Sequence, residues 1–112
     1  MSRVVVLGGG ESGVGSAVLA KAKGFDVFLS DMGKLSEKYI AMLDQWEIPY
    51  EQGGHSEELI LNADEVIKSP GIPETAPMVQ KIAEKGIGVI SEIEFAGRYD
   101  SAKKVCITGS NG

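Results

Sequence analysis

The chain has 112 residues, enough for one domain of ordinary size, and its 43% hydrophobic and 24% charged residues are typical of a globular protein. A net charge of −5 argues against a nucleic-acid-binding surface, which is normally basic. The only cysteine, Cys106, excludes an intramolecular disulfide and favours a reducing compartment. The apolar run before Gly8 is too short for a signal peptide or a membrane span, so we expect a cytoplasmic protein without membrane contact.

Apolar runs alternate with amphipathic stretches along the chain, which predicts alternating strands and helices. Strands are expected at residues 4–7, 25–30, 50–52, 63–68 and around 89–90. Helices are expected at residues 12–23, 34–46, 57–62, 76–85 and 91–99. This order predicts an α/β fold, a Rossmann-like doubly wound parallel sheet of about five strands with helices on both faces.

Several side chains have predicted structural roles in these helices. Ser91 and Glu94 have the spacing of a capping box at the start of the last helix. Thr75 is expected to cap the helix before it. Tyr39 and Trp46 fall on the apolar stripe of the second helix and are expected in the core.

The segment from Gly8 to Gly13 matches the pattern G-x-G-x-x-G between a strand and a helix. In such a turn, Gly10 lets the backbone approach a diphosphate and Gly13 lets the helix lie close to the sheet. The helix N-terminus offers free N–H groups to anionic oxygens. We therefore favour a phosphate site over a turn without a ligand, and the carboxylate of Glu11 would repel a diphosphate there unless it points to solvent.

Asp31 ends the second strand, 18 residues beyond Gly13. An acidic residue at this place in a dinucleotide-binding domain binds the ribose hydroxyls of NAD. The glycine loop and Asp31 by themselves thus predict an NAD(H)-binding module of an oxidoreductase or a regulatory protein. The alternative for Asp31 is a solvated carboxylate or the cap of the next helix.

Two further segments do not belong to a general NAD domain. Residues 69–73 form a Ser-Pro-Gly-Ile-Pro loop, rigid because of its prolines, which is expected beside the glycine loop. Residues 105–112 begin a new apolar strand that runs into a glycine-rich turn. We interpret this second segment as the start of another domain.

Four segments together resemble the Mur ligase family, and the resemblance covers the whole chain: residues 4–13, 67–72, 91–94 and 107–112. The last segment, Ile-Thr-Gly-Ser-Asn-Gly, is the most specific, because the phosphate loop of that family continues with Lys and Ser/Thr. Ile107 stands where a general P-loop has glycine, so the family's shorter motif fits better.

The resemblance implies a three-domain ligase that uses ATP and Mg²⁺ to join D-glutamate to UDP-N-acetylmuramoyl-L-alanine in peptidoglycan precursor synthesis. Residues 1–99 would bind the UDP substrate, residues 100–104 would be a linker, and residues 105–112 would open the central ATPase domain. The remnant of the ATP loop would be Gly109, Ser110, Asn111 and Gly112. The chain alone is expected to be inactive, since the ATP-binding lysine and the Mg²⁺ ligands would follow Gly112.

The resemblance also implies a set of substrate-binding residues: Gly10, Glu11, Ser12, Gly13, Asp31, Met32, Gly33, Ser69, Pro70 and Gly71. The turn at Gly10–Gly13 would hold the UDP diphosphate, and Asp31 with the residues after it would contact the uracil. The hydroxyl of Ser12 would donate to a phosphate oxygen and cap the helix. We expect no catalytic or metal-binding residue in the chain, and His55 is expected to be structural or exposed to solvent.

Overall fold

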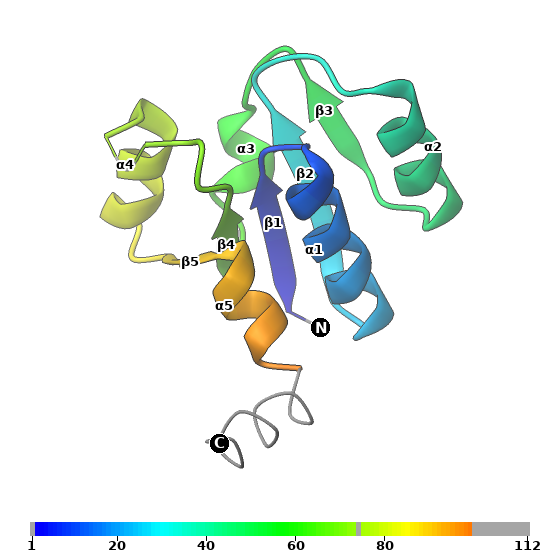
Figure 1. The fold of residues 1–112 in the computed structure, drawn as a ribbon. Helices are drawn as coiled ribbons and strands as arrows, with labels where there is room; N and C mark the ends of the chain where they lie inside the picture. The colour runs from blue at the N-terminus through cyan, green and yellow to red at the C-terminus, as the bar shows by residue number, and fades with distance from the viewer. Residues whose placement is uncertain (1, 74, 100–112) are drawn as a thin grey trace, which may run out of the picture.

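The computed structural model describes residues 2–73 and 75–99, which form one five-stranded parallel sheet in the order β3-β2-β1-β4-β5 (Figure 1). The strands are β1 (Arg3–Leu7), β2 (Asp26–Asp31), β3 (Tyr50–Gln52), β4 (Glu65–Lys68) and β5 (Gly88–Ser91). The helices are α1 (Glu11–Ala22), α2 (Glu37–Gln45), α3 (Glu57–Ile60), α4 (Pro77–Glu84) and α5 (Glu92–Gly97). The predicted α/β fold class is therefore confirmed.

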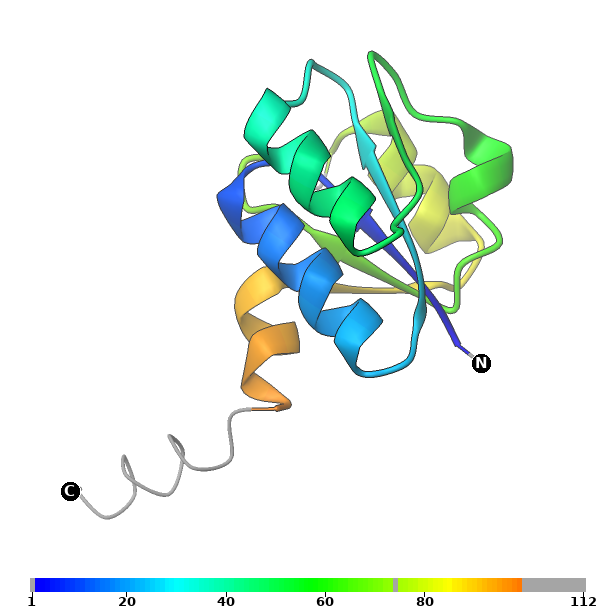
Figure 2. The same ribbon diagram turned by 90° about the vertical axis from the view of Figure 1, so that its right-hand side faces the viewer.

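Helices cover both faces of the sheet, as the side view shows (Figure 2). α1 packs beside α2 and α5 on one face, while α3 and α4 lie on the other. Successive residues of a strand point to opposite faces, so β1 contributes Val4 and Val6 to one core and Val5 and Leu7 to the second. All four side chains are almost fully buried, which explains the continuous apolar run in this strand.

The order in which strands are added to the sheet reverses at β1, although all the strands run parallel. The chain first builds β2 and β3 on one side of β1 and then returns to build β4 and β5 on the other. Leu7 consequently pairs with Ser30 of β2 and with Lys68 of β4. Ligands of such sheets bind beyond the carboxyl ends of the strands at this switch point, so the ends of β1, β2 and β4 are where a site is expected.

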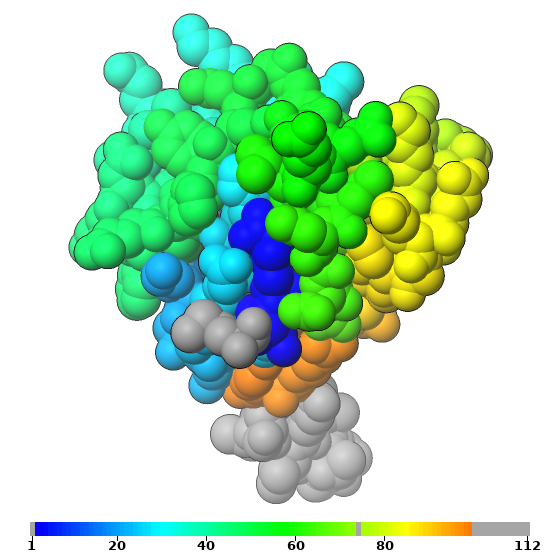
Figure 3. Space-filling view, turned by 180° about the vertical axis from the view of Figure 1, so that it is seen from behind, coloured from blue at the N-terminus to red at the C-terminus, as the bar shows by residue number. Residues whose placement is uncertain are grey.

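The opposite, amino end of the sheet is held together by Arg3. Its backbone N–H donates to Asp64 at 2.7 Å, and its guanidinium donates to Asn62 at 2.9 Å, Asp26 at 3.0 Å and the carbonyl of Leu59 at 2.8 Å. Figure 3 shows the start of β1, in blue, between the cyan residues of β2 and the green residues around α3 and β4. Arg3 thus connects β1 and β2 with α3 and with the segment that leads from α3 to β4.

Two predictions about the helices are wrong and one is confirmed. Thr75 does not cap α4: the N-cap is Ala76, because Pro77 occupies the first helical position and holds the residue before it in an extended conformation. Trp46 is 38% exposed, because α2 ends at Gln45 and Leu43 and Ile48 fill the core instead. The capping box of Ser91 and Glu94 is present at α5.

The predicted linker at residues 100–104 and the predicted strand and phosphate loop at residues 105–112 lie outside the described residues. Within the described part of the chain, every helix is too short or too polar to cross a bilayer.

Candidate functional site

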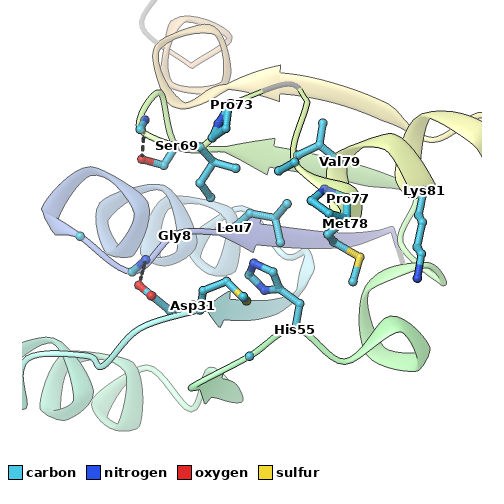
Figure 4. Close-up of a pocket in the computed structure, with 17 residues that line it drawn as sticks. Leu7, Gly8, Asp31, His55, Ser69, Pro73, Pro77, Met78, Val79 and Lys81 are labelled. Carbon is cyan, nitrogen blue, oxygen red and sulfur yellow. Dashed lines mark hydrogen bonds between the residues drawn. The ribbon is translucent and has the colours of Figure 1, made fainter.

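A cavity of about 650 Å³ opens at the carboxyl edge of the sheet. It lies between α4 and the loops that follow β1, β2, β3 and β4, as the close-up shows (Figure 4). Leu7, Ile72, Met78 and Val79 make part of its wall apolar. The cavity is therefore at the switch point that the topology selects, and its size suits a small organic ligand.

The glycine loop between β1 and α1 packs too tightly for side chains at three positions, Gly8, Gly9 and Gly13. A Cβ at Gly9 would lie 1.9 Å from Cδ2 of Leu35. Gly8 has a φ of +104°, and a Cβ there would lie 2.7 Å from the Cβ of Ser69. A Cβ at Gly13 would lie 1.9 Å from the carbonyl oxygen of Gly8. A Cβ at Gly10, by contrast, would meet nothing within 4 Å. Gly8 and Gly13 are thus required by packing, whereas the bare backbone at Gly10 faces open space in the cavity wall.

Free backbone donors mark the start of α1. Gly10 is the N-cap, and no side chain caps the helix, so the expected capping role of Ser12 is wrong: Ser12 already lies in the first turn. The N–H groups of Glu11, Ser12 and Gly13 have no acceptor among the described residues. The N-terminus of this twelve-residue helix therefore combines unpaired donors with the positive end of the helix dipole, which favours an anion.

Asp31 fixes the conformation of the glycine loop. Its Oδ2 accepts the N–H of Gly9 at 2.7 Å, and its Oδ1 accepts the N–H of Gly33 at 2.7 Å. Asp31 is therefore neither a freely solvated carboxylate nor the cap of α2, whose N-cap is Ser36. Each oxygen retains a further lone pair that a ligand donor in the cavity can use.

The loop after β4 lies against the glycine loop, as expected. The N–H of Ser69 donates to the carbonyl of Leu7 at 3.0 Å, which places Ser69 beside Gly8. Lys68 closes the turn, because its Nζ donates to the carbonyl of Ile72 at 2.6 Å and to that of Ser69 at 3.3 Å. The Ser-Pro-Gly turn is thus held in a fixed position at the edge of the cavity.

The predicted substrate-binding residues fall into two groups. The first group lines the cavity: Gly10, Asp31, Met32, Ser69 and Gly71. The second group lies outside its lining: Glu11, Ser12, Gly13, Gly33 and Pro70. Ser12 and Pro70 line a separate hollow of about 370 Å³ between α1 and α5. The predicted ATP-loop residues 109–112 lie outside the described part of the chain.

A carboxyl group without a hydrogen bond lies behind the glycine loop. Glu92, the first residue of α5, is 7% exposed, and its Oε2 has no partner among the described residues. Oε2 lies 3.4 Å from the position that a Cβ at Gly13 would take. Burial raises the pKa of Glu92, and the positive charge of Lys68 opposes this only in part.

His55 lines the cavity, which the sequence analysis did not anticipate. Its Nδ1 lies 2.7 Å from Oγ of Ser30, so it has a partner and a defined orientation. The signal that would have found it is its place in the loop after β3, because every loop at the carboxyl edge is a candidate for ligand contact. Among residues 2–73 and 75–99, no three Cys, His, Asp or Glu side chains gather as metal ligands would.

Residues 2–91 match the family model described as Mur ligase MurD-like, N-terminal domain. The chain is 63% identical over 112 residues to the UDP-N-acetylmuramoylalanine--D-glutamate ligase of Bacteroides thetaiotaomicron, which covers 100% of this chain and 25% of that protein. The ligase of the same name from Porphyromonas gingivalis is 62% identical over 109 residues, 97% of this chain and 24% of that protein. The chain thus spans about a quarter of the length of these relatives.

A solved structure agrees with the family match. The pseudomurein peptide ligase type C from Methanothermus fervidus has a TM-score of 0.78 at 27% identity, over 89% of this chain and 21% of that one. These findings favour the Mur ligase interpretation over an NAD(H)-binding module. The chain belongs to the MurD-like Mur ligases and matches their N-terminal domain.

Proposed function

We propose that this chain is the substrate-binding domain of a ligase that adds D-glutamate to UDP-N-acetylmuramoyl-L-alanine. The observation that carries the proposal is the coincidence of a family match over residues 2–91 with a cavity of about 650 Å³ at the switch point of the sheet. The relatives that cover the whole chain carry the name of this ligase, which supports the choice of substrate.

The diphosphate of UDP would bind at the N-terminus of α1. Three N–H groups there, from residues 11–13, have no acceptor in the described part of the chain, and Gly10 leaves room for the backbone to approach the phosphates. Glu11 is exposed and does not line the cavity, so its charge is screened by water. The uridine would then extend across the ends of β2 and β3, where Asp31, Met32 and His55 line the cavity.

In the proposed reaction, an oxygen of the substrate carboxylate attacks the γ-phosphorus of ATP, which forms an acyl phosphate and releases ADP. The amine of D-glutamate then attacks the acyl carbon, so that an amide forms and inorganic phosphate leaves. ATP and Mg²⁺ would act in the central domain that residues 105–112 are predicted to open. The described residues would hold the UDP end of the substrate. The single cysteine of the sequence favours a reducing compartment, so we propose that the reaction takes place in the cytoplasm.

Calorimetric titration of UDP and of UDP-N-acetylmuramoyl-L-alanine into the chain tests this proposal, with Gly10→Ala as the informative variant. A Cβ at Gly10 meets no protein atom within 4 Å, so the fold should tolerate it, while it should block the diphosphate and weaken binding about tenfold or more. Gly15→Ala is the matched control, because Gly15 also has open space around its position but lies one turn further along α1 and does not line the cavity.

The proposal would be wrong if the wild-type chain took up no UDP at millimolar concentration, or if Gly10→Ala bound UDP as tightly as Gly15→Ala. Binding of NADH in place of UDP would restore the NAD(H) alternative. A thermal shift gives an independent readout, because a ligand at 100 times its Kd stabilises the folded chain by about 2.7 kcal/mol.

A further inference from the structure

His55 is held in the cavity by two linked side chains from neighbouring strands, the buried Ser30 and the half-buried Glu51. Ser30 of β2 and Glu51 of β3 are register partners, and the Oγ of Ser30 lies 2.7 Å from Oε2 of Glu51. The same Oγ lies 2.7 Å from Nδ1 of His55. Ser30 is fully buried, while Glu51 and His55 are half-buried.

The proton positions in this chain of groups follow from what each group can donate. Ser56 donates to both oxygens of Glu51, from its Oγ at 2.6 Å and from its N–H at 2.7 Å. Burial alone would raise the pKa of Glu51, but these bonds and the one from Ser30 outweigh it, so the pKa is lowered and the group is an ionised acceptor. The single hydroxyl proton of Ser30 therefore points to Glu51, because the carbonyl of Gly54 is a distant alternative at 3.4 Å.

The hydroxyl oxygen of Ser30 then offers only a lone pair to His55, so Nδ1 of His55 must carry the proton. Burial lowers the pKa of His55, and the charges of Glu51 and Asp31 oppose this only in part, so the ring is neutral at pH 7. A neutral ring protonated at Nδ1 has a bare lone pair at Nε2. Among the described residues Nε2 has no hydrogen-bond partner, and the ring faces the cavity near Leu7 and Met78 (Figure 4).

We propose that Nε2 of His55 is a fixed hydrogen-bond acceptor for an N–H or O–H group of the ligand's nucleoside, and that Ser30 and Glu51 are positioning residues that select its tautomer. The inference rests on the proposed function, because it takes the ligand to be a uridine nucleotide. The donors that uridine presents are the imide N–H of uracil and the hydroxyls of ribose. Leu7 and Met78 make the wall beside the ring apolar, and Asp31 is the other side-chain acceptor at the proposed uridine end of the cavity.

The tautomer is measured without any ligand. His55 is the only histidine of the chain, so a long-range ¹H–¹⁵N correlation spectrum shows a single imidazole ring. We expect a protonated Nδ1 and a bare Nε2 at pH 7, and a shift toward the other tautomer in Ser30→Ala. A ring protonated at Nε2 in the wild-type chain would overturn the proposal.

Binding of UDP tests the role of the acceptor. His55→Phe keeps an aromatic ring without nitrogen and should weaken UDP binding about fivefold to tenfold, while His55→Gln can present an amide oxygen near the same place and should restore part of the loss. UDP methylated at uracil N3 and 2′,3′-dideoxy-UDP separate the two donors. The analogue that lacks the group donating to His55 should bind the wild-type chain more weakly than UDP does. For that analogue, His55→Phe should cause no additional loss of affinity.

The outcomes separate this inference from the proposed function. If the wild-type chain binds UDP and His55→Phe binds it equally well, His55 is no acceptor for the nucleoside and the proposed function stands. The inference also fails if His55→Phe weakens the binding of both analogues by the same factor as it weakens the binding of UDP, because neither donor would then depend on His55. If the wild-type chain binds no UDP, the proposed function fails and this inference fails with it.

Discussion

Substitution of Gly13 by alanine tests how closely α1 must approach β1. The new Cβ would lie 1.9 Å from the carbonyl oxygen of Gly8, and real contacts of this kind are not shorter than about 3.0 Å, so the two backbones must separate by about 1.1 Å. The oxygen belongs to the backbone and a Cβ has no rotatable bond that could move it, so no side-chain rotation relieves the clash. The helix cannot easily shift either, because α1 buries Val14, Ala17 and Ala20 in the core. Overpacking of this severity costs about 3 kcal/mol or more.

The assay is the free energy of unfolding from chemical denaturation, with the melting temperature as a second readout. We expect Gly13→Ala to lose about 3 kcal/mol, which lowers the Tm of a domain of this size by about 12 °C or more. Gly15→Ala is the control in the same helix: its Cβ meets nothing within 4 Å, so it should gain up to about 1 kcal/mol from helix propensity. Equal stability of the two variants would refute the reasoning, because the clash would then be absent.

Two further predictions concern the carboxyl groups near the site. Asp31→Asn should lower the free energy of unfolding by about 1.5–3 kcal/mol, because an amide oxygen can replace only one of the two bonds to Gly9 and Gly33; unchanged stability in denaturant would show that these bonds do not hold the loop. The pKa of Glu92 is raised in the folded chain above the ordinary value of 4.5, so the folded chain keeps a proton that the unfolded chain releases. The free energy of unfolding therefore falls as the pH rises from the pKa of the unfolded chain to that of the folded chain. Glu92→Gln should therefore be more stable than the wild-type chain at about pH 8 and nearly equal to it at about pH 4, and parallel denaturation curves with the same difference at both pH values would contradict this.

The strands and the glycine loop could be predicted from the sequence because their signals are local. The apolar run at Val4–Leu7 and the glycine spacing after it depend on neighbouring residues only, and both are confirmed. The cap of α4 was predicted wrongly because two local preferences compete. Thr75 favours the N-cap position, but Pro77 favours the first helical position, which makes Ala76 the N-cap. Trp46 was misplaced because a helical stripe does not say where the helix ends.

The contacts of His55 could not be predicted, since they depend on strand register. Ser30 and Glu51 are 21 residues apart and meet only because β2 pairs with β3 in one particular alignment. A shift of that alignment by one residue would turn the side chains of one strand to the other face of the sheet. The bond from the N–H of Gly9 to Asp31 likewise depends on how closely the glycine loop folds back over the end of β2.

The hydrogen bonds of Arg3 hold the amino end of the sheet together, whereas the cavity lies at the carboxyl end. β1 has five residues, so Arg3 and Leu7 at its two ends are about 13 Å apart, beyond the range of direct contact. Substitutions at exposed cavity positions that do not hold the loops, such as Met32, can therefore accumulate over evolution without loosening the anchored end. A chain with this architecture is free to acquire a different ligand while it keeps the same core.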